Sequence, residues 1–141
     1  RRAKKLYELL LILQYTLPGN PCIFYGSEVG MHGYKDPFNR KPFPWNRIDK
    51  ALLHTHIMLG AMRKQNREAL SDANWKLVRC DNEIICYKRN NLLIVINRGA
   101  NAFRVEIPEE FKTAEIIYTS NKHQKQVNEI LAETGMILRR R

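Results

Sequence analysis

The chain has 141 residues, 44% of them hydrophobic and 27% charged, which is the balance of one ordinary globular domain or a small pair of domains. Its net charge of +10 would suit a nucleic-acid-binding protein if charge were the only feature. The positive charges gather at the two ends, however, and no basic run in the interior alternates with aromatic residues. We therefore expect no nucleic-acid partner.

Cysteine usage and hydropathy exclude further classes of protein. The three cysteines, Cys22, Cys80 and Cys86, form an odd and sparse set without zinc-ligand spacing. Neither a disulfide framework nor a metal site is therefore expected, and no motif indicates a cofactor. The apolar stretch Leu9 to Leu13 is far too short to span a bilayer, so we expect no membrane partner. The chain starts at an arginine and not at a methionine, which indicates a piece of a longer protein.

A first helix is predicted over residues 2–16. Leucines recur there at spacings of three and four, which places them along one helical face, and charged residues lie off that stripe. Pro18 and Gly19 then end the helix, because neither residue continues a helix well.

The stretch after this helix organises the rest of the chain. Cys22 to Tyr25 is a short apolar run flanked by turn residues, which predicts a strand buried on both faces, with Cys22 as a small buried side chain. Gly26 to Trp45 is polar, rich in glycine and proline, and too long for a mere connector. A buried strand that opens into a long loop is how α/β barrels build active sites.

A second helix is predicted from near Asn46 to about Leu70. Asn46 is a plausible N-cap, and Asp49 three residues later suits the positive end of a helix. His54 and His56 lie two positions apart, so they point to different faces of the helix and cannot chelate one metal ion. We interpret them as solvated or hydrogen-bonded histidines.

From Ala73 onward the hydrophobic period changes to two, which is typical of strands. Two-residue joints at Asp81-Asn82 and Asn90-Asn91 indicate hairpins, and the wholly apolar run Leu92 to Ile96 predicts a central strand covered on both sides. The predicted strands are 75–80, 83–89, 92–97, 102–107, 116–119 and 136–139. Six strands with short turns predict an antiparallel β-sandwich over residues 72–141, separate from the helical residues 1–71.

Three motifs between Thr16 and Trp45 carry a resemblance to a known family. They are LPGNPCIFYG, the following SEVGM, and GYKDPFNRKPFPW. Together they resemble the last barrel strand and following loop of the α-amylase family of glycoside hydrolases, in the neopullulanase, cyclomaltodextrinase and amylopullulanase branch. The resemblance implies an α+β fold class. Residues 1–71 would be the last helix–strand–helix of a catalytic TIM (β/α)8 barrel, and residues 72–141 the C-terminal antiparallel β-sandwich.

The same resemblance implies a function. The chain would be part of a retaining glycoside hydrolase that acts on α-glucosidic bonds of α-glucans or dextrins. Retaining hydrolysis needs two carboxyl groups about 5–5.5 Å apart, and in this family they follow earlier barrel strands, upstream of residue 1. We therefore expect no catalytic residue in this chain and no activity from the chain alone. The alternatives are a non-catalytic carbohydrate-binding or fold-supporting β-sandwich module, and a basic nucleic-acid-binding or partner-binding domain.

The expected site is for sugar binding. By position in the family loop, Asp36 and Arg40 would contact a glucose unit of an α-glucan oligosaccharide in the intact enzyme, and Tyr34 and Trp45 could stack on sugar rings. The simpler reading is that Asp36 and Arg40 form a local salt bridge that holds the loop. Removal of the other barrel strands would also uncover apolar surface, so we expect the chain to self-associate through residues 2–70.

Overall fold

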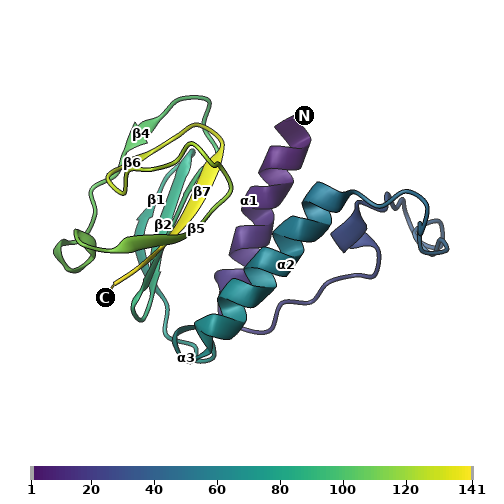
Figure 1. The fold of residues 1–141 in the computed structure, drawn as a ribbon, viewed down its shortest axis with the longest axis horizontal. Helices are drawn as coiled ribbons and strands as arrows, with labels where there is room; N and C mark the ends of the chain where they lie inside the picture. The colour runs from purple at the N-terminus through teal and green to yellow at the C-terminus, as the bar shows by residue number, and fades with distance from the viewer. Residues whose placement is uncertain (1, 141) are drawn as a thin grey trace.

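The structure is a computed structural model that describes residues 2–140, so the terminal charges of Arg1 and Arg141 lie outside it. Its first element, α1 (Arg2–Thr16), confirms the predicted first helix (Figure 1). One face of α1 buries Leu9, Ile12 and Tyr15, each no more than 5% exposed. The helix ends where predicted, at Thr16, two residues before Pro18, because Pro18 and Gly19 do not continue its hydrogen-bond ladder.

The second helix is shorter than predicted. It consists of α2 (Lys50–Gln65) and, after a break at Asn66, the single turn α3 (Arg67–Leu70). The N-cap is Asp49 and not Asn46, so that prediction is wrong: the Asp49 carboxylate accepts hydrogen bonds from the backbone N–H groups of Ala51 (3.1 Å) and Leu52 (3.0 Å). These bonds satisfy two donors at the first helical turn. A hydrogen bond from the Lys4 ammonium lowers the pKa of Asp49, and the bonds from the Leu52 and Ala51 N–H groups lower it further.

The second half of the chain forms a five-stranded antiparallel sheet in the order β1-β2-β3-β7-β5. Its strands are β1 (Lys76–Cys80), β2 (Ile84–Arg89), β3 (Leu92–Asn97), β5 (Glu115–Thr119) and β7 (Thr134–Arg139). The two predicted hairpin joints connect β1 to β2 and β2 to β3. Asn90 takes the left-handed conformation that such a turn requires, with φ of 52°.

A second, two-stranded sheet pairs β4 (Phe103–Arg104) with β6 (Glu129–Ile130). The strand predicted over 102–107 is therefore only two residues long, although its inward side chains Phe103, Val105 and Ile107 still pack inward. Strand β6 was not predicted, because two residues are too few to show a period of two. Two short 3-10 helices, η1 (Ser27–Val29) and η2 (Glu109–Phe111), complete the elements.

Both faces of the large sheet are covered, one by the helices and the other by the β4–β6 side (Figure 1). Strand β3 shows this best, since all six of its residues are buried. Leu92, Ile94 and Ile96 pack with α1 and α2, whereas Leu93 and Val95 pack with Phe111 and Ile130. The prediction of a central strand covered on both sides is confirmed, and the fold is α+β with an antiparallel sheet.

Two arginines hold the C-terminal end of α1, one from the sheet and one from α2. Arg89 on β2 is fully buried and donates hydrogen bonds to the carbonyls of Thr16 (2.6 Å) and Leu70 (3.0 Å), and also to those of Asp72 and Asn74. Arg63 on α2 donates to the carbonyls of Tyr15 (2.7 Å) and Gly19 (2.6 Å). Hydrogen bonds from the sheet and from α2 therefore fix the C-terminal end of α1. They also fix the start of the segment that follows it.

The strand predicted over Cys22 to Tyr25 does not form. The segment is extended coil, its cysteine is exposed, and Ile23, Phe24 and Tyr25 are 39–51% exposed. A strand needs backbone partners on a neighbouring strand, and among residues 2–140 none lies beside this segment. Its carbonyl at Cys22 instead accepts a hydrogen bond from the Gln14 side chain at 2.5 Å.

None of the helices in the described residues 2–140 has the length and hydropathy that a membrane span requires. Within the same residues, no three histidine, cysteine or acidic side chains gather where they could hold a metal ion.

Candidate functional site

The long loop between η1 and α2 lies at the end of the molecule away from the sheet, beyond the two helices (Figure 1). Gly26 and Gly30 bracket η1 with φ of 85° and 76°, a conformation that glycine adopts without strain. The loop is closed at its base, because the N–H of Asp49 donates to the carbonyl of Val29 at 3.1 Å. The loop residues 30–48 therefore begin and end close together, beside the start of α2.

Asp36 and Arg40 form an ion pair in the outer part of this loop. Asp36 Oδ1 accepts a hydrogen bond from Arg40 Nε at 3.0 Å, and the side chains are 60% and 72% exposed. The Phe38 N–H donates to the Lys35 carbonyl and the Arg40 N–H to the Pro37 carbonyl, which folds residues 35–40 into consecutive turns. The pair therefore orients both charged groups while it leaves most of their hydrogen-bonding capacity open to solvent.

Aromatic rings on the loop are unusually exposed. Tyr34 is 80% exposed and Trp45 is 76% exposed, and the Trp45 ring lies against Phe43 with 4.6 Å between ring centroids. Among the described residues, no ring contact or hydrogen bond joins Tyr34 or Trp45 to the Asp36–Arg40 pair. The structure therefore brings Asp36 and Arg40 into contact and leaves the exposed rings of Tyr34 and Trp45 apart from that pair, on the same loop.

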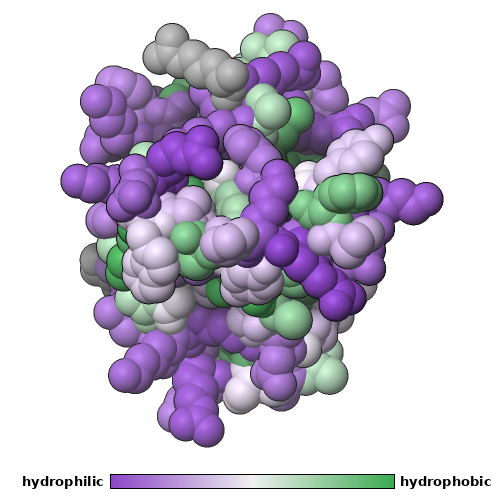
Figure 2. Space-filling view, turned by 90° about the vertical axis from the view of Figure 1, so that its right-hand side faces the viewer, coloured by the Kyte–Doolittle hydropathy of each residue, from purple (hydrophilic) through white to green (hydrophobic). Residues whose placement is uncertain are grey.

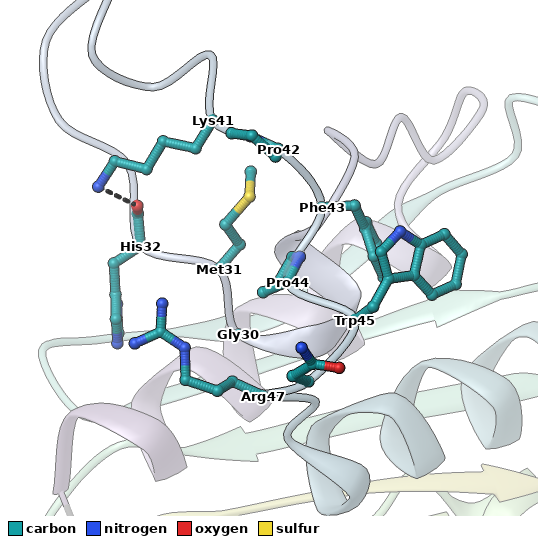
Figure 3. Close-up of a pocket in the computed structure, with 10 residues that line it drawn as sticks. Gly30, Met31, His32, Lys41, Pro42, Phe43, Pro44, Trp45 and Arg47 are labelled. Atoms are coloured by element: carbon teal, nitrogen blue, oxygen red, sulfur yellow. Dashed lines mark hydrogen bonds between the residues drawn. The ribbon is translucent and has the colours of Figure 1, made fainter.

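The two arms of the loop enclose a hollow of about 780 Å³ (Figure 3). Its lining comes from residues 30–32 on one arm and 41–47 on the other. Met31 points between the arms, and the Lys41 ammonium donates to the carbonyl of His32 at 3.3 Å, which ties the arms together. Trp45 lines this hollow, whereas Tyr34, Asp36 and Arg40 do not.

Sequence reasoning missed the polar lining of the hollow, which His32, Lys41 and Arg47 supply. The contacts that build it join residues nine or more positions apart, such as Lys41 to His32 and the Tyr25 hydroxyl to the Lys41 carbonyl at 2.8 Å. No periodicity relates such residues. The only signal in the sequence was the clustering of basic and aromatic residues around Pro42 and Pro44.

A buried polar cluster lies beneath the loop. His56 on α2 is 5% exposed, and its Nδ1 is 3.1 Å from the Tyr15 hydroxyl, which confirms the interpretation of a hydrogen-bonded histidine. Burial lowers the pKa of His56, and the charge of Glu28 on η1 opposes that shift. His56 Nε2 and Glu28 Oε2 are both buried without a partner in the described residues. The cluster therefore favours a neutral His56.

Figure 2 views the molecule from the end that carries the loop. Weakly polar and apolar side chains gather toward the middle of this face, and strongly polar ones surround them. A surface of this kind suits a ligand that offers both hydroxyl groups and apolar C–H faces.

No family model matches the chain. Among curated proteins, it is 35% identical over 109 residues to a cyclomaltodextrinase of Geobacillus thermopakistaniensis, covering 72% of this chain and 18% of that protein. It is 32% identical over 135 residues to a maltogenic alpha-amylase of Bacillus acidopullulyticus, covering 89% of this chain and 22% of that protein. The chain thus spans about a fifth of the length of these relatives.

Solved structures show the same relationship. The type III pullulan hydrolase of Thermococcus kodakarensis superposes with a TM-score of 0.82 at 25% identity, over 97% of this chain and 23% of that one. A maltogenic amylase of S. marinus superposes with a TM-score of 0.75 at 28% identity, over 96% and 19% of the two chains. The chain belongs to the α-amylase family of glycoside hydrolases, in the branch of the cyclomaltodextrinases, maltogenic amylases and amylopullulanases, and it resembles their C-terminal part.

Proposed function

We propose that the chain is part of a retaining glycoside hydrolase that acts on α-glucosidic bonds of α-glucans or dextrins. The observation that carries this proposal is the exposed Asp36–Arg40 pair, with Tyr34 and Trp45 on the same loop, in a chain related to cyclomaltodextrinases and maltogenic amylases. The relatives' names give the reaction class, and the loop supplies groups that suit its substrates.

In this proposal, residues 1–71 belong to the end of a (β/α)8 barrel and residues 72–141 form its C-terminal β-sandwich. The succession of α1, an extended apolar segment, a long loop and α2 supports the barrel assignment. The segment at Ile23, Phe24 and Tyr25 has the composition of a barrel strand and would acquire backbone partners beside other barrel strands.

The role of the loop would be to bind sugar and not to cleave the bond. A carboxylate such as Asp36 accepts hydrogen bonds from vicinal hydroxyls, and the Arg40 guanidinium donates to them. Their mutual 3.0 Å contact preorganises both groups, which lowers the entropy lost when a sugar binds. The flat faces of Tyr34 and Trp45 offer stacking surfaces for pyranose rings. No cofactor is needed for such chemistry.

A reducing-sugar assay tests the proposal. The 141-residue chain should release no reducing sugar from maltotriose or pullulan, whereas a protein that carries this chain together with the catalytic part of the family should do so. Turnover by the chain above a boiled control, surviving Asp36→Ala, would contradict the assignment of bond cleavage to groups outside it.

One observation favours an additional, fold-supporting role for residues 72–141. The large sheet covers the buried faces of α1 and α2, and Arg89 on the sheet holds the ends of α1 and α3. The sheet would thereby brace the two helices from which the sugar-binding loop projects.

A further inference from the structure

The loop that carries Asp36 and Arg40 is attached to the helices through η1. This short helix packs against α2, and Gly26 and Gly30 on either side of it take left-handed conformations. A Cβ at Gly30 would lie 3.3 Å from the Cβ of Asp49, so the backbone there runs close to the start of α2. The placement of η1 therefore sets where the loop leaves the helices.

Two buried polar atoms lie on the two elements that meet here. They are His56 Nε2 on α2 and Glu28 Oε2 on η1, and neither has a hydrogen-bond partner within residues 2–140. The charge of Glu28 acts on His56, because it opposes the effect of burial on the pKa of the imidazole. A ring N–H and a carboxylate oxygen are complementary, so each of these atoms offers what the other lacks.

The other ring nitrogen of His56 selects the tautomer that such a pairing requires. His56 Nδ1 lies 3.1 Å from the Tyr15 hydroxyl on α1, and the two rings meet edge-on with 5.9 Å between centroids. In a neutral imidazole one nitrogen donates and the other accepts. When the Tyr15 O–H donates to Nδ1, Nε2 carries the hydrogen and can donate to the Glu28 carboxylate. Neutral His56 then connects α1 with η1.

Protonation of His56 changes both contacts at once. Nδ1 then carries a hydrogen and no longer accepts one from Tyr15, so that hydrogen bond must reverse its direction. The ring also gains a positive charge, which attracts the Glu28 carboxylate more strongly in buried surroundings than it would in water. Because η1 is a single turn between two glycines, its backbone can follow that attraction with little strain.

The remaining titratable groups near this pair stay neutral while His56 titrates. They are Tyr7 and Tyr15 on α1, both of which respond to the charge of Glu28. Burial raises the pKa of each tyrosine above its ordinary value of 10.0, far from the range of a histidine. Among the described residues, Glu28 is therefore the charged group that acts on His56.

We propose that His56 and Glu28 form a pH-sensitive latch that positions the loop. Neutral His56 holds α1 and η1 through its two ring nitrogens. Protonated His56 draws η1 toward α2, and with it residues 30–32, the arm of the hollow that follows η1. The latch needs no ligand, so it is independent of the sugar-binding role of the loop. His56 is a positioning residue, since it acts on the loop through Glu28.

The test is a pH titration of the 141-residue chain followed by NMR. Every chain carries His32→Gln, so that no reporter in the loop follows the imidazole of His32. The ring signal of His56 gives the midpoint of its protonation. The amides of residues 27–31 should shift with that same midpoint. The indole N–H of Trp45 should do so too, because Trp45 lines the hollow from the other arm and would sense a movement that a nearby charge alone does not produce.

Three variants separate the latch from an indirect effect. In Glu28→Gln the charge that opposes burial is gone, so the midpoint of the His56 ring should move to lower pH, and the loop signals should move with it. In His56→Gln the loop signals should lose this titration. His54→Gln, on an exposed side chain of the same helix, should leave it unchanged.

Two results would overturn the latch. One is that the amides of residues 27–31 and the Trp45 indole do not follow the His56 ring in the His32→Gln chain, a comparison that depends on no further variant. The other is that their midpoint stays the same in Glu28→Gln while its melting temperature matches that of the His32→Gln chain.

Discussion

The joint between helices and sheet gives the sharpest prediction about stability, because it depends on one buried side chain. Arg89→Met keeps most of the volume of Arg89 and removes its hydrogen bonds to the Thr16 and Leu70 carbonyls. Thr16 O loses its charged donor, and Leu70 O keeps only a long contact of 3.4 Å from Arg63. The carbonyls of Asp72 and Asn74 belong to exposed residues and can be hydrated instead.

Two buried acceptors left without a good donor cost about 1–3 kcal/mol each. Part of this is regained, because the guanidinium is fully buried and its nearest carboxylate, that of Asp72, is 3.8 Å away. We expect a net loss of about 3 kcal/mol in the free energy of unfolding, and a fall of roughly 10 °C in Tm for a chain of this size.

Urea unfolding followed by far-UV circular dichroism measures this loss. The control is Arg98→Met, on an exposed arginine that donates to the Asn82 carbonyl, and it should cost less than about 1 kcal/mol. In Arg89→Met, the helical and the sheet signals should also disappear together, at a lower urea concentration than in the parent chain. A loss below about 1 kcal/mol, or helices that melt while the sheet stays unchanged, would refute the reasoning.

Two further predictions concern the buried histidine and the exposed apolar segment. Burial lowers the pKa of His56 below its ordinary value of 6.5, so the unfolded chain binds a proton more tightly than the folded chain does. The free energy of unfolding should therefore fall as the pH drops through 6.5. Unfolding measured at several pH values should show that His56→Gln reduces this fall and that His54→Gln does not. We also expect the chain to self-associate through residues 2–70; light scattering at micromolar concentration should show species larger than a monomer that Phe24→Ser reduces, and a strictly monomeric parent chain would defeat the idea.

Hydrophobic periodicity along the sequence predicted the helix and the strand that depend on neighbouring residues alone. The apolar period of three and four gave α1, and the uniform apolarity of 92–96 gave a central strand buried on both faces. The Cys22–Tyr25 strand was predicted from equally apolar composition and does not form, because pairing depends on a neighbouring strand and not on composition. Strand β6 was not predicted, because it has only two residues and forms through pairing with β4, which is distant in the sequence.

The candidate site also contains one contact that local sequence predicts and one feature that it does not. Asp36 and Arg40 are four positions apart in a turn, so their contact follows from the local sequence. The hollow between residues 30–32 and 41–47 depends on how two arms of a loop return to each other, and no short-range pattern encodes that. The roles of Asp36, Arg40, Tyr34 and Trp45 in sugar binding remain predictions.

The measurement that tests the sugar-binding role most directly is the dependence of binding on oligosaccharide length in the intact enzyme that the proposal implies. Asp36→Ala and Arg40→Ala should each weaken binding of long maltodextrins by about 1–3 kcal/mol, because each removes hydrogen bonds between a charged group and sugar hydroxyls. Lys35→Ala, on the same loop, is the control and should have little effect. The loss should fade for substrates too short to reach Asp36 and Arg40. Equal losses for short and long substrates would contradict the account and leave the pair as a local salt bridge that holds the loop.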